Sequence, residues 1–265
     1  MKQIYKAKLV TLAALLLTVL VYLTQPGGES YVFITDLMAV IFSLAAVVTG
    51  YFAMRTYGFK SLHGKAMFLM LMGMSIWFVT ELLWIVFMSP IRMILEALRF
   101  AGYVPITCGF FFALSVSSPR FREEKGNIIL VLGSFLIFSI AYMISLPIIL
   151  VQPLIDSILT SGYIVADFAM LFGIALLIRV SLSFRGGLMS KGWVIFILAF
   201  LSLLAFDVNF AMNYQTYTGG NLSEVFWLFT YILASFGFYY NTHAVSILRG
   251  RMKRKARRKK KGKRH

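Results

Sequence analysis

The chain has 265 residues, of which 60% are hydrophobic and 14% are charged. Soluble domains are usually under half apolar and about a quarter charged, so the composition excludes an ordinary globular enzyme, a disordered chain and a disulfide-rich scaffold. The single cysteine, Cys108, also excludes an internal disulfide and a cysteine-based zinc site. The formal net charge is +16, from 26 Lys and Arg against 10 Asp and Glu. A chain this apolar must keep these charges apart from its apolar segments.

Eight apolar segments are long enough to cross a bilayer as helices, which takes about 20 residues. They cover residues 7–24, 32–54, 66–88, 92–115, 127–149, 154–179, 192–213 and 224–246. The first follows three lysines, as a signal peptide would, but no small-x-small cleavage site follows it, so we expect a membrane helix there. The sequence therefore predicts an all-α, polytopic membrane protein with eight transmembrane helices.

The basic residues lie on one side of this arrangement. If the eight spans alternate in direction, 24 of the 26 basic residues fall at the two termini and in the loops after the second, fourth and sixth spans. Cytoplasmic segments of membrane proteins carry the excess of Lys and Arg. We therefore expect a multi-pass cell-membrane protein with both termini in the cytoplasm.

Twelve of the basic residues fall between Arg249 and Arg264. A run of like charges repels itself and stays solvated unless a polyanion binds it. We thus predict a membrane domain at 1–248 and a disordered basic cytoplasmic tail at 249–265. The tail has three interpretations: a stop-transfer segment that sets the topology, a docking site for anionic lipid, or a site for a nucleic acid such as ribosomal RNA.

The two halves of the membrane domain, about 1–119 and 127–248, are similar to each other. At an offset of 128 residues, EALRFAGYVPITCGFFF (96–112) aligns with EVFWLFTYILASFGFYY (224–240), and the matched pairs are Glu96 with Glu224, Tyr103 with Tyr231, Gly109 with Gly237 and Phe110 with Phe238. Acids elsewhere recur in the same order, Asp36 with Asp167 and Glu81 with Asp207. The pattern predicts two parallel four-helix repeats around a pseudo-two-fold axis normal to the membrane.

Six acidic residues fall within or at the outer ends of the predicted spans. An ionised carboxylate at the bilayer centre costs about 2.5–3.5 kcal/mol, so such residues usually face the protein interior. The predicted topology places them mainly in the outer half of the membrane: Asp36, Glu81, Glu96, Asp167, Asp207 and Glu224.

Aromatic and basic side chains share helix faces with these acids. Spacings of three and four residues create three stripes: Trp77, Glu81 and Trp84; Glu96, Arg99 and Tyr103; Glu224, Trp227 and Tyr231. The spacing also allows Glu96 to pair with Arg99. Carboxylates framed by aromatic rings suit an outward-open pocket for a cation, an amine or a proton. Two other interpretations stay open, because polar residues also join helices to each other and Trp and Tyr gather at membrane interfaces.

Motifs of the common catalytic and cofactor sites are missing from the sequence. It has no P-loop, no Rossmann glycine fingerprint, no GxSxG elbow and no HExxH zinc motif. We therefore expect a protein that is not an enzyme and that holds neither a cofactor nor a metal.

The stretch GMSIWFVTELLWIVFMSPIRMILEALRFAGYVPITCGFFFAL (73–114) resembles the membrane input region of prokaryotic sensor histidine kinases and diguanylate cyclases. Those regions have a Trp–Glu–Trp helix and then an acid and a Gly-Tyr pair, which here are Trp77, Glu81, Trp84, Glu96 and Gly102-Tyr103. The segments GYIVADFAMLF (162–172) and FDVN (206–209) are similar too, so the resemblance extends over about 30–240. In that family a kinase or cyclase domain follows the last helix, whereas here the basic tail does. The resemblance therefore implies an input module that needs a separate cytoplasmic signalling partner.

These observations fit three functions. The first is a sensor or receptor-like module that binds a small ligand, a cation or a lipid in the outer acidic and aromatic pocket and signals to a cytoplasmic partner. The second is a small transporter or proton-coupled carrier that uses the same carboxylates. The third is a membrane scaffold whose basic tail docks a polyanion.

Overall fold

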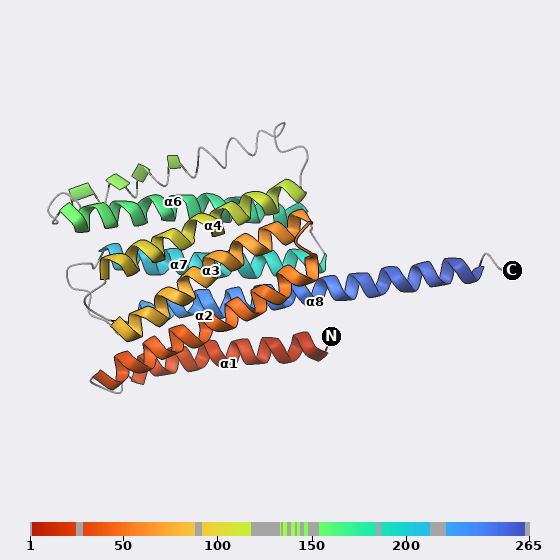
Figure 1. Ribbon diagram of the computed structural model, residues 1–265, viewed down its shortest axis with the longest axis horizontal. Helices are drawn as coiled ribbons and strands as arrows, with labels where there is room; N and C mark the ends of the chain where they lie inside the picture. Colours follow the sequence, from red (N-terminus) through yellow and green to blue (C-terminus); the bar gives the residue numbers. More distant parts are fainter. Residues whose placement is uncertain are drawn as a thin grey trace.

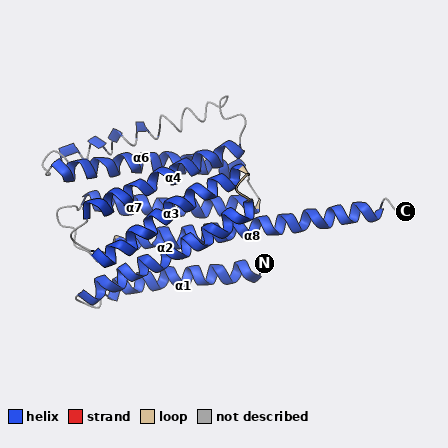
Figure 2. Ribbon diagram, viewed as in Figure 1, coloured by secondary structure: helices blue, strands red, loops and turns tan. Residues whose placement is uncertain are grey.

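The computed structural model describes residues 2–24, 29–87, 92–117, 154–183, 187–212 and 221–262, with single helical positions between 133 and 147. These residues form helices and no strand, as Figure 2 shows. The helices are α1 (Lys2–Thr24), α2 (Glu29–Tyr57), α3 (Leu62–Phe87), α4 (Arg92–Ser117), α6 (Leu154–Ser183), α7 (Leu188–Met212) and α8 (Glu224–Gly262). The prediction of an all-α fold is confirmed.

Six segments of these helices are long and apolar enough to cross a membrane: Gln3–Thr24, Tyr31–Tyr57, Leu62–Phe87, Ile94–Ser115, Thr160–Leu182 and Leu188–Phe210. They define a multi-pass membrane protein. The prediction of eight spans is not confirmed, because the fifth predicted span (127–149) lies outside the described residues except for those single positions, and α8 is not among the six.

The composition of α8 explains why it differs from the other helices. Its first half mixes Phe and Leu with Trp227, Tyr231 and Asn241, and its second half is basic. All three of these side chains are buried. A helix enclosed by other helices has little surface toward lipid, so it tolerates polar groups that a lipid-facing helix would not.

The helices pack as a ring that α8 closes. α3 packs between α2 and α4, α6 packs between α4 and α7, and α8 packs on both α7 and α2. α1 lies outside this ring and packs on α8. In Figure 1 the helices run roughly parallel or antiparallel to one another along the long axis of the molecule.

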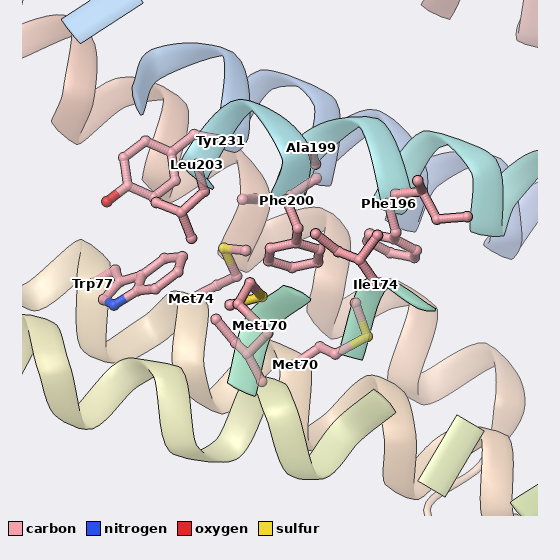
Figure 3. Packing of buried hydrophobic residues seen from close by; sticks show 14 of the residues in the cluster. Met70, Met74, Trp77, Met170, Ile174, Phe196, Ala199, Phe200, Leu203 and Tyr231 are labelled. Carbon is pink, nitrogen blue, oxygen red and sulfur yellow. The ribbon is translucent and has the colours of Figure 1, made fainter. Parts of the chain in front are cut away.

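The interior of the ring is apolar through most of its length. Figure 3 shows Met70, Met74, Met170, Phe196 and Phe200 from α3, α6 and α7 packed together, and each is fully buried. Large apolar side chains also cover the outside, and the exposed ones include Leu16, Ile41, Val86, Val104 and Leu198. An exterior as apolar as this suits lipid rather than water as the surrounding solvent.

Glycines bring α3 and α4 close together. A Cβ atom at Gly73 would lie 2.6 Å from the backbone oxygen of Gly102, and a Cβ atom at Gly102 would overlap the indole ring of Trp77. Small residues permit such approaches between membrane helices, which associate through packing and hydrogen bonds rather than through the hydrophobic effect. The close contact places the Trp77 indole against the backbone of α4.

The last helix is longer than predicted. α8 continues without a break to Gly262, through most of the stretch that we predicted to be disordered. Lys, Arg and Ala are good helix formers, and extending an existing helix avoids the cost of nucleating a new one. Figure 1 shows the end of α8 projecting beyond the rest of the bundle.

The two ends of the bundle differ in charge. The N-terminal end of α1, the turn between α2 and α3, and the projecting part of α8 lie at the same end (Figure 1). Arg55, Lys60 and Lys65 occupy this end, and the basic stretch of α8 begins here with Arg249. Five of the six acids predicted to lie in the spans sit instead toward the other end, and Asp167 lies near the middle of α6.

Candidate functional site

Four of the six acids meet inside the ring at the end away from the basic residues. Glu81 comes from the last turns of α3, Glu96 from the first turns of α4, and Asp207 from the last turns of α7. Asp167 lies closer to the middle of α6. They form a single group of contacts, which we call the outer polar cluster. Its other members are Arg99 and six aromatic residues: Trp77, Trp84, Tyr103, Tyr163, Trp227 and Tyr231.

Glu81 is the acceptor at the centre of the outer polar cluster. Trp227 Nε1 and Tyr231 OH of α8 each donate a hydrogen bond of 2.9 Å to its Oε1 atom. Arg99 of α4 approaches the same atom at 3.5 Å. One carboxylate oxygen thus links α3, α4 and α8.

Arg99 lies between two indole rings and two carboxylates. Its guanidinium carbon lies 5.3 Å from the ring centroid of Trp84 and 5.0 Å from that of Trp227, both within the range of cation–π attraction. Its nitrogens lie 3.5 Å from Glu81 and 3.8 Å from Glu96, so the predicted pairing of Glu96 with Arg99 is confirmed. The backbone oxygen of Arg99 also accepts a 2.7 Å hydrogen bond from Trp77 Nε1.

A second acceptor lies across the ring, on α7. Tyr103 OH donates a 2.6 Å hydrogen bond to Asp207 Oδ2. Asp167 of α6 lies beside Asp207. Two carboxyl groups of the cluster thus come from α6 and α7.

A tyrosine connects the two acceptor groups. Tyr163 of α6 donates to Glu96 Oε2, and its ring lies 6.4 Å from that of Tyr103. Trp77 also packs edge-on against Tyr103, with 5.2 Å between the ring centroids. The cluster is thus continuous from α8 through α3 and α4 to α6 and α7.

The two remaining acids lie at the border of the cluster. Glu224 accepts a 2.9 Å hydrogen bond from Tyr22 of α1. Asp36 of α2 has a buried Oδ2 atom without a hydrogen-bond partner among the described residues. The structure thus joins ten of the twelve residues that the sequence singled out and leaves these two beside the group.

Burial distinguishes this arrangement from the outward-open pocket that we expected. Glu81 and Asp207 are each only 5% exposed, and Glu96 is 7% exposed. Their oxygens bind protein donors rather than facing solvent. Within the described residues, no group of three or more His, Cys, Asp or Glu side chains is placed to hold a metal ion.

Sequence reasoning missed two tyrosines of this region. Tyr163 precedes Asp167 by four residues, so it shares a helix face with that acid, and the spacing could have revealed it. Tyr22 had no such signal, because nothing in the sequence indicates that α1 packs on α8. Both hydroxyl groups donate to a glutamate on another helix.

No protein-family model, no curated protein and no solved structure matches this chain. The resemblance to kinase and cyclase input regions therefore stays a prediction.

Proposed function

We propose that the protein is a membrane sensor that detects a small ligand in the outer polar cluster and signals through α8 to a partner on the cytoplasmic side. One observation carries this proposal: α8 is a single unbroken helix that bears Trp227 and Tyr231 near one end and the basic stretch at the other. Both side chains donate to Glu81. A change at Glu81 therefore acts directly on the helix that leaves the bundle.

The number of helices in the cluster supports a signalling role. Glu81, Glu96 and Asp207 link α3, α4, α6, α7 and α8 through buried hydrogen bonds and ion pairs. Helix shifts of about 1–2 Å are a common form of signal transmission in proteins. A ligand that changed this bonding would alter how several helices pack at once.

We also propose that the membrane domain consists of two parallel repeats. The neighbour order supports this, because α2, α3 and α4 follow one another in the ring as α6, α7 and α8 do. The bonds repeat as well: Tyr103 donates to Asp207, and its match Tyr231 donates to Glu81, the match of Asp207.

The packing of two matched phenylalanines suggests how the proposed repeats differ in register. Phe110 of α4 contacts Gly173 of α6, and its match Phe238 of α8 contacts Gly50 of α2. These glycines are 123 residues apart, whereas Asp36 and Asp167 are 131 apart. Relative to the glycine in its own half, Asp167 therefore lies about two helical turns deeper than Asp36 lies relative to the glycine in the other half.

Labels on the cytoplasmic-side loop and on α8 test the signalling proposal. Spin labels at Lys60→Cys and Gly250→Cys, in a Cys108→Ser background, report the distance between α8 and the turn after α2. We expect Glu81→Gln to shift this distance distribution by 1–2 Å or more, because it weakens the acceptor for both α8 donors. The control is Val86→Ala, a change on the same helix at a side chain that is 64% exposed.

A break in α8 provides the decisive comparison. Ser246 is exposed and lies between the buried part of α8 and the basic stretch. Proline there removes a helical hydrogen bond and kinks the helix. We expect Ser246→Pro, but not Ser246→Ala, to abolish the effect of Glu81→Gln at position 250. An identical distribution in Glu81→Gln and the parent would contradict signalling through α8.

Proton-coupled transport is the second candidate, favoured by the buried carboxyl groups of Glu81, Glu96 and Asp207. Intramembrane carboxylates that exchange protons occur in pumps and transporters. If the protein carries protons, proteoliposomes with an imposed membrane potential should acidify, and Asp207→Asn should abolish this flux. A parent protein that moves no protons would exclude this function while leaving the sensor proposal intact.

The cell-membrane location, the cytoplasmic position of both termini and the partner of the basic stretch are further parts of the proposal. The basic end of the bundle supports the orientation through the positive-inside rule. Binding of residues 249–265 to anionic lipid or to nucleic acid stays a prediction from their charge.

A further inference from the structure

The bonding of Arg99 is looser than that of a permanent buried ion pair. Charge-assisted hydrogen bonds between nitrogen and a carboxylate are usually about 2.7–2.9 Å long. The nitrogens of Arg99 stand 3.5 Å and 3.8 Å from Glu81 and Glu96. Its Nε atom is buried and has no hydrogen-bond partner among the described residues. Two faces of indole rings, rather than close hydrogen bonds, hold this guanidinium group.

The charge around Arg99 is also unbalanced. Four carboxyl groups, those of Glu81, Glu96, Asp167 and Asp207, belong to the cluster, and Arg99 is its one guanidinium group. Carboxyl groups thus outnumber the guanidinium group in the cluster. An excess of acidic groups favours the binding of a further cation.

The surroundings of Arg99 match the way proteins recognise organic cations. Trp84 and Trp227 supply the two aromatic faces, and Glu81 and Glu96 supply the carboxylates. Indole is the aromatic ring that binds a cation most strongly, and aromatic cages are the usual device for alkylammonium ligands. The side chain of Arg99 is 17% exposed, more than those of Glu81 and Glu96, at 6% and 9%.

We propose that the guanidinium group of Arg99 occupies the ligand site when no ligand is bound, and that the outer polar cluster binds an organic cation with a guanidinium or amine head in its place. This assignment rests on the proposed function and adds the chemical class of its ligand. The ligand head lies between the two indole rings and bonds Glu81 and Glu96, while Arg99 withdraws. Because Trp227 belongs to α8, exchange of the two cations changes the contacts of the helix that leaves the bundle.

Binding of methylguanidinium to the full chain in detergent tests this proposal. If Arg99 occupies the site in most molecules, it lowers the apparent affinity for methylguanidinium, because only the remaining fraction of sites can bind it. We therefore expect saturable binding to the parent, and binding at least ten-fold tighter to Arg99→Ala, measured by calorimetry. Methylurea, which is neutral and of similar shape, should bind neither protein. Arg55→Ala, a change at an exposed arginine far from the cluster, should leave the affinity as in the parent.

Two further variants ensure that the result can be interpreted. Arg99→Gln keeps most of the side-chain volume without the charge, so it replaces Arg99→Ala if that variant fails to fold. In either background, Glu81→Gln should reduce methylguanidinium binding by ten-fold or more. Equal affinities of the parent and the Arg99 variants, or binding to a variant but none to the parent, would overturn the proposal. The label distances at positions 60 and 250 still test signalling through α8 if the cation fails to bind.

Discussion

Tyrosine hydroxyl groups hold the carboxylates of the outer polar cluster in place. Tyr103 and Tyr231 each donate to an acid on a helix across the ring, and both tyrosines are nearly or fully buried. A buried carboxylate that loses a donor has no water to replace it, so each hydroxyl group stabilises its acid by more than an exposed one would.

We expect Tyr103→Phe and Tyr231→Phe each to lower the free energy of unfolding by about 1–2 kcal/mol, because each leaves one carboxylate oxygen short of a donor. Denaturant unfolding in detergent, followed by tryptophan fluorescence, measures this loss. Tyr5→Phe is the control, since Tyr5 is 64% exposed. A loss as large in Tyr5→Phe would show that the hydrogen bonds in the cluster are not its cause.

A glycine on α4 sets the position of the Trp77 indole. We expect Gly102→Ala to destabilise the fold by about 1–3 kcal/mol, because its Cβ atom would overlap Trp77 and break the bond to the Arg99 backbone oxygen. At Gly162 the nearest atom to an added Cβ is 3.6 Å away, so Gly162→Ala should be neutral or stabilising. Unfolding midpoints of the two variants provide the comparison. Equal midpoints would contradict the close packing of α3 on α4.

The residues of the cluster were predictable from the sequence, but most of their partners were not. Helical spacing revealed the stripes that contain Glu81, Arg99 and Trp227, and it predicted the pairing of Glu96 with Arg99. The bonds from Trp227 to Glu81 and from Tyr103 to Asp207 cross between helices. Such pairs depend on which helices are neighbours and how they are rotated, and spacing within one helix carries no information on either.

At the scale of helices, α1 is attached differently from the ring. It packs on α8, and its exposed apolar side chains include Leu9, Leu16, Leu17 and Leu20. Lipid solvates such side chains as well as protein does, so a specific hydrogen bond counts for more in holding a membrane helix. The bond from Tyr22 to Glu224 holds α1 near its C-terminal end.

We expect Tyr22→Phe to loosen the C-terminal end of α1 without unfolding the ring. Spin labels at Leu23→Cys and Leu222→Cys, in the Cys108→Ser background, should give a broader distance distribution in this variant than in the parent. Both label positions are exposed, at 67% and 49%. Tyr5→Phe, on the same helix, should leave the distribution unchanged, and an unchanged distribution in Tyr22→Phe would contradict the anchoring role.

For the whole molecule, hydropathy identified the apolar helices because it measures the preference for lipid over water. It did not indicate the order of helices in the ring, since every membrane helix is apolar whichever helix lies beside it. It also did not indicate that α8 is enclosed, although the Trp and Tyr content of that helix agrees with burial. The basic stretch was predicted to be disordered from its charge, and the helix continuing out of the bundle overrides that tendency.

The arrangement of the helix ends leads to a test of the topology. Reagents that do not cross membranes should label Lys60→Cys, Gly187→Cys and Gly250→Cys from one side of a sealed vesicle, and Leu222→Cys from the other. This follows from the opposite directions of successive helices (Figure 1). The Cys108→Ser parent is the background control. Labelling of positions 60 and 222 from the same side would contradict this arrangement of the helices.

The length of α8 amplifies small changes in its tilt. From the fully buried Ala244 to Gly262 the helix extends about 27 Å at a rise of 1.5 Å per residue. A tilt of about 10° at the bundle would displace the far end by about 5 Å over this length. A rearrangement too small to open the ring would thus become, at the basic end, a movement comparable to the spacing of one helical turn. A partner bound to this end would respond to the tilt angle of α8 rather than to the distances between helices inside the bundle.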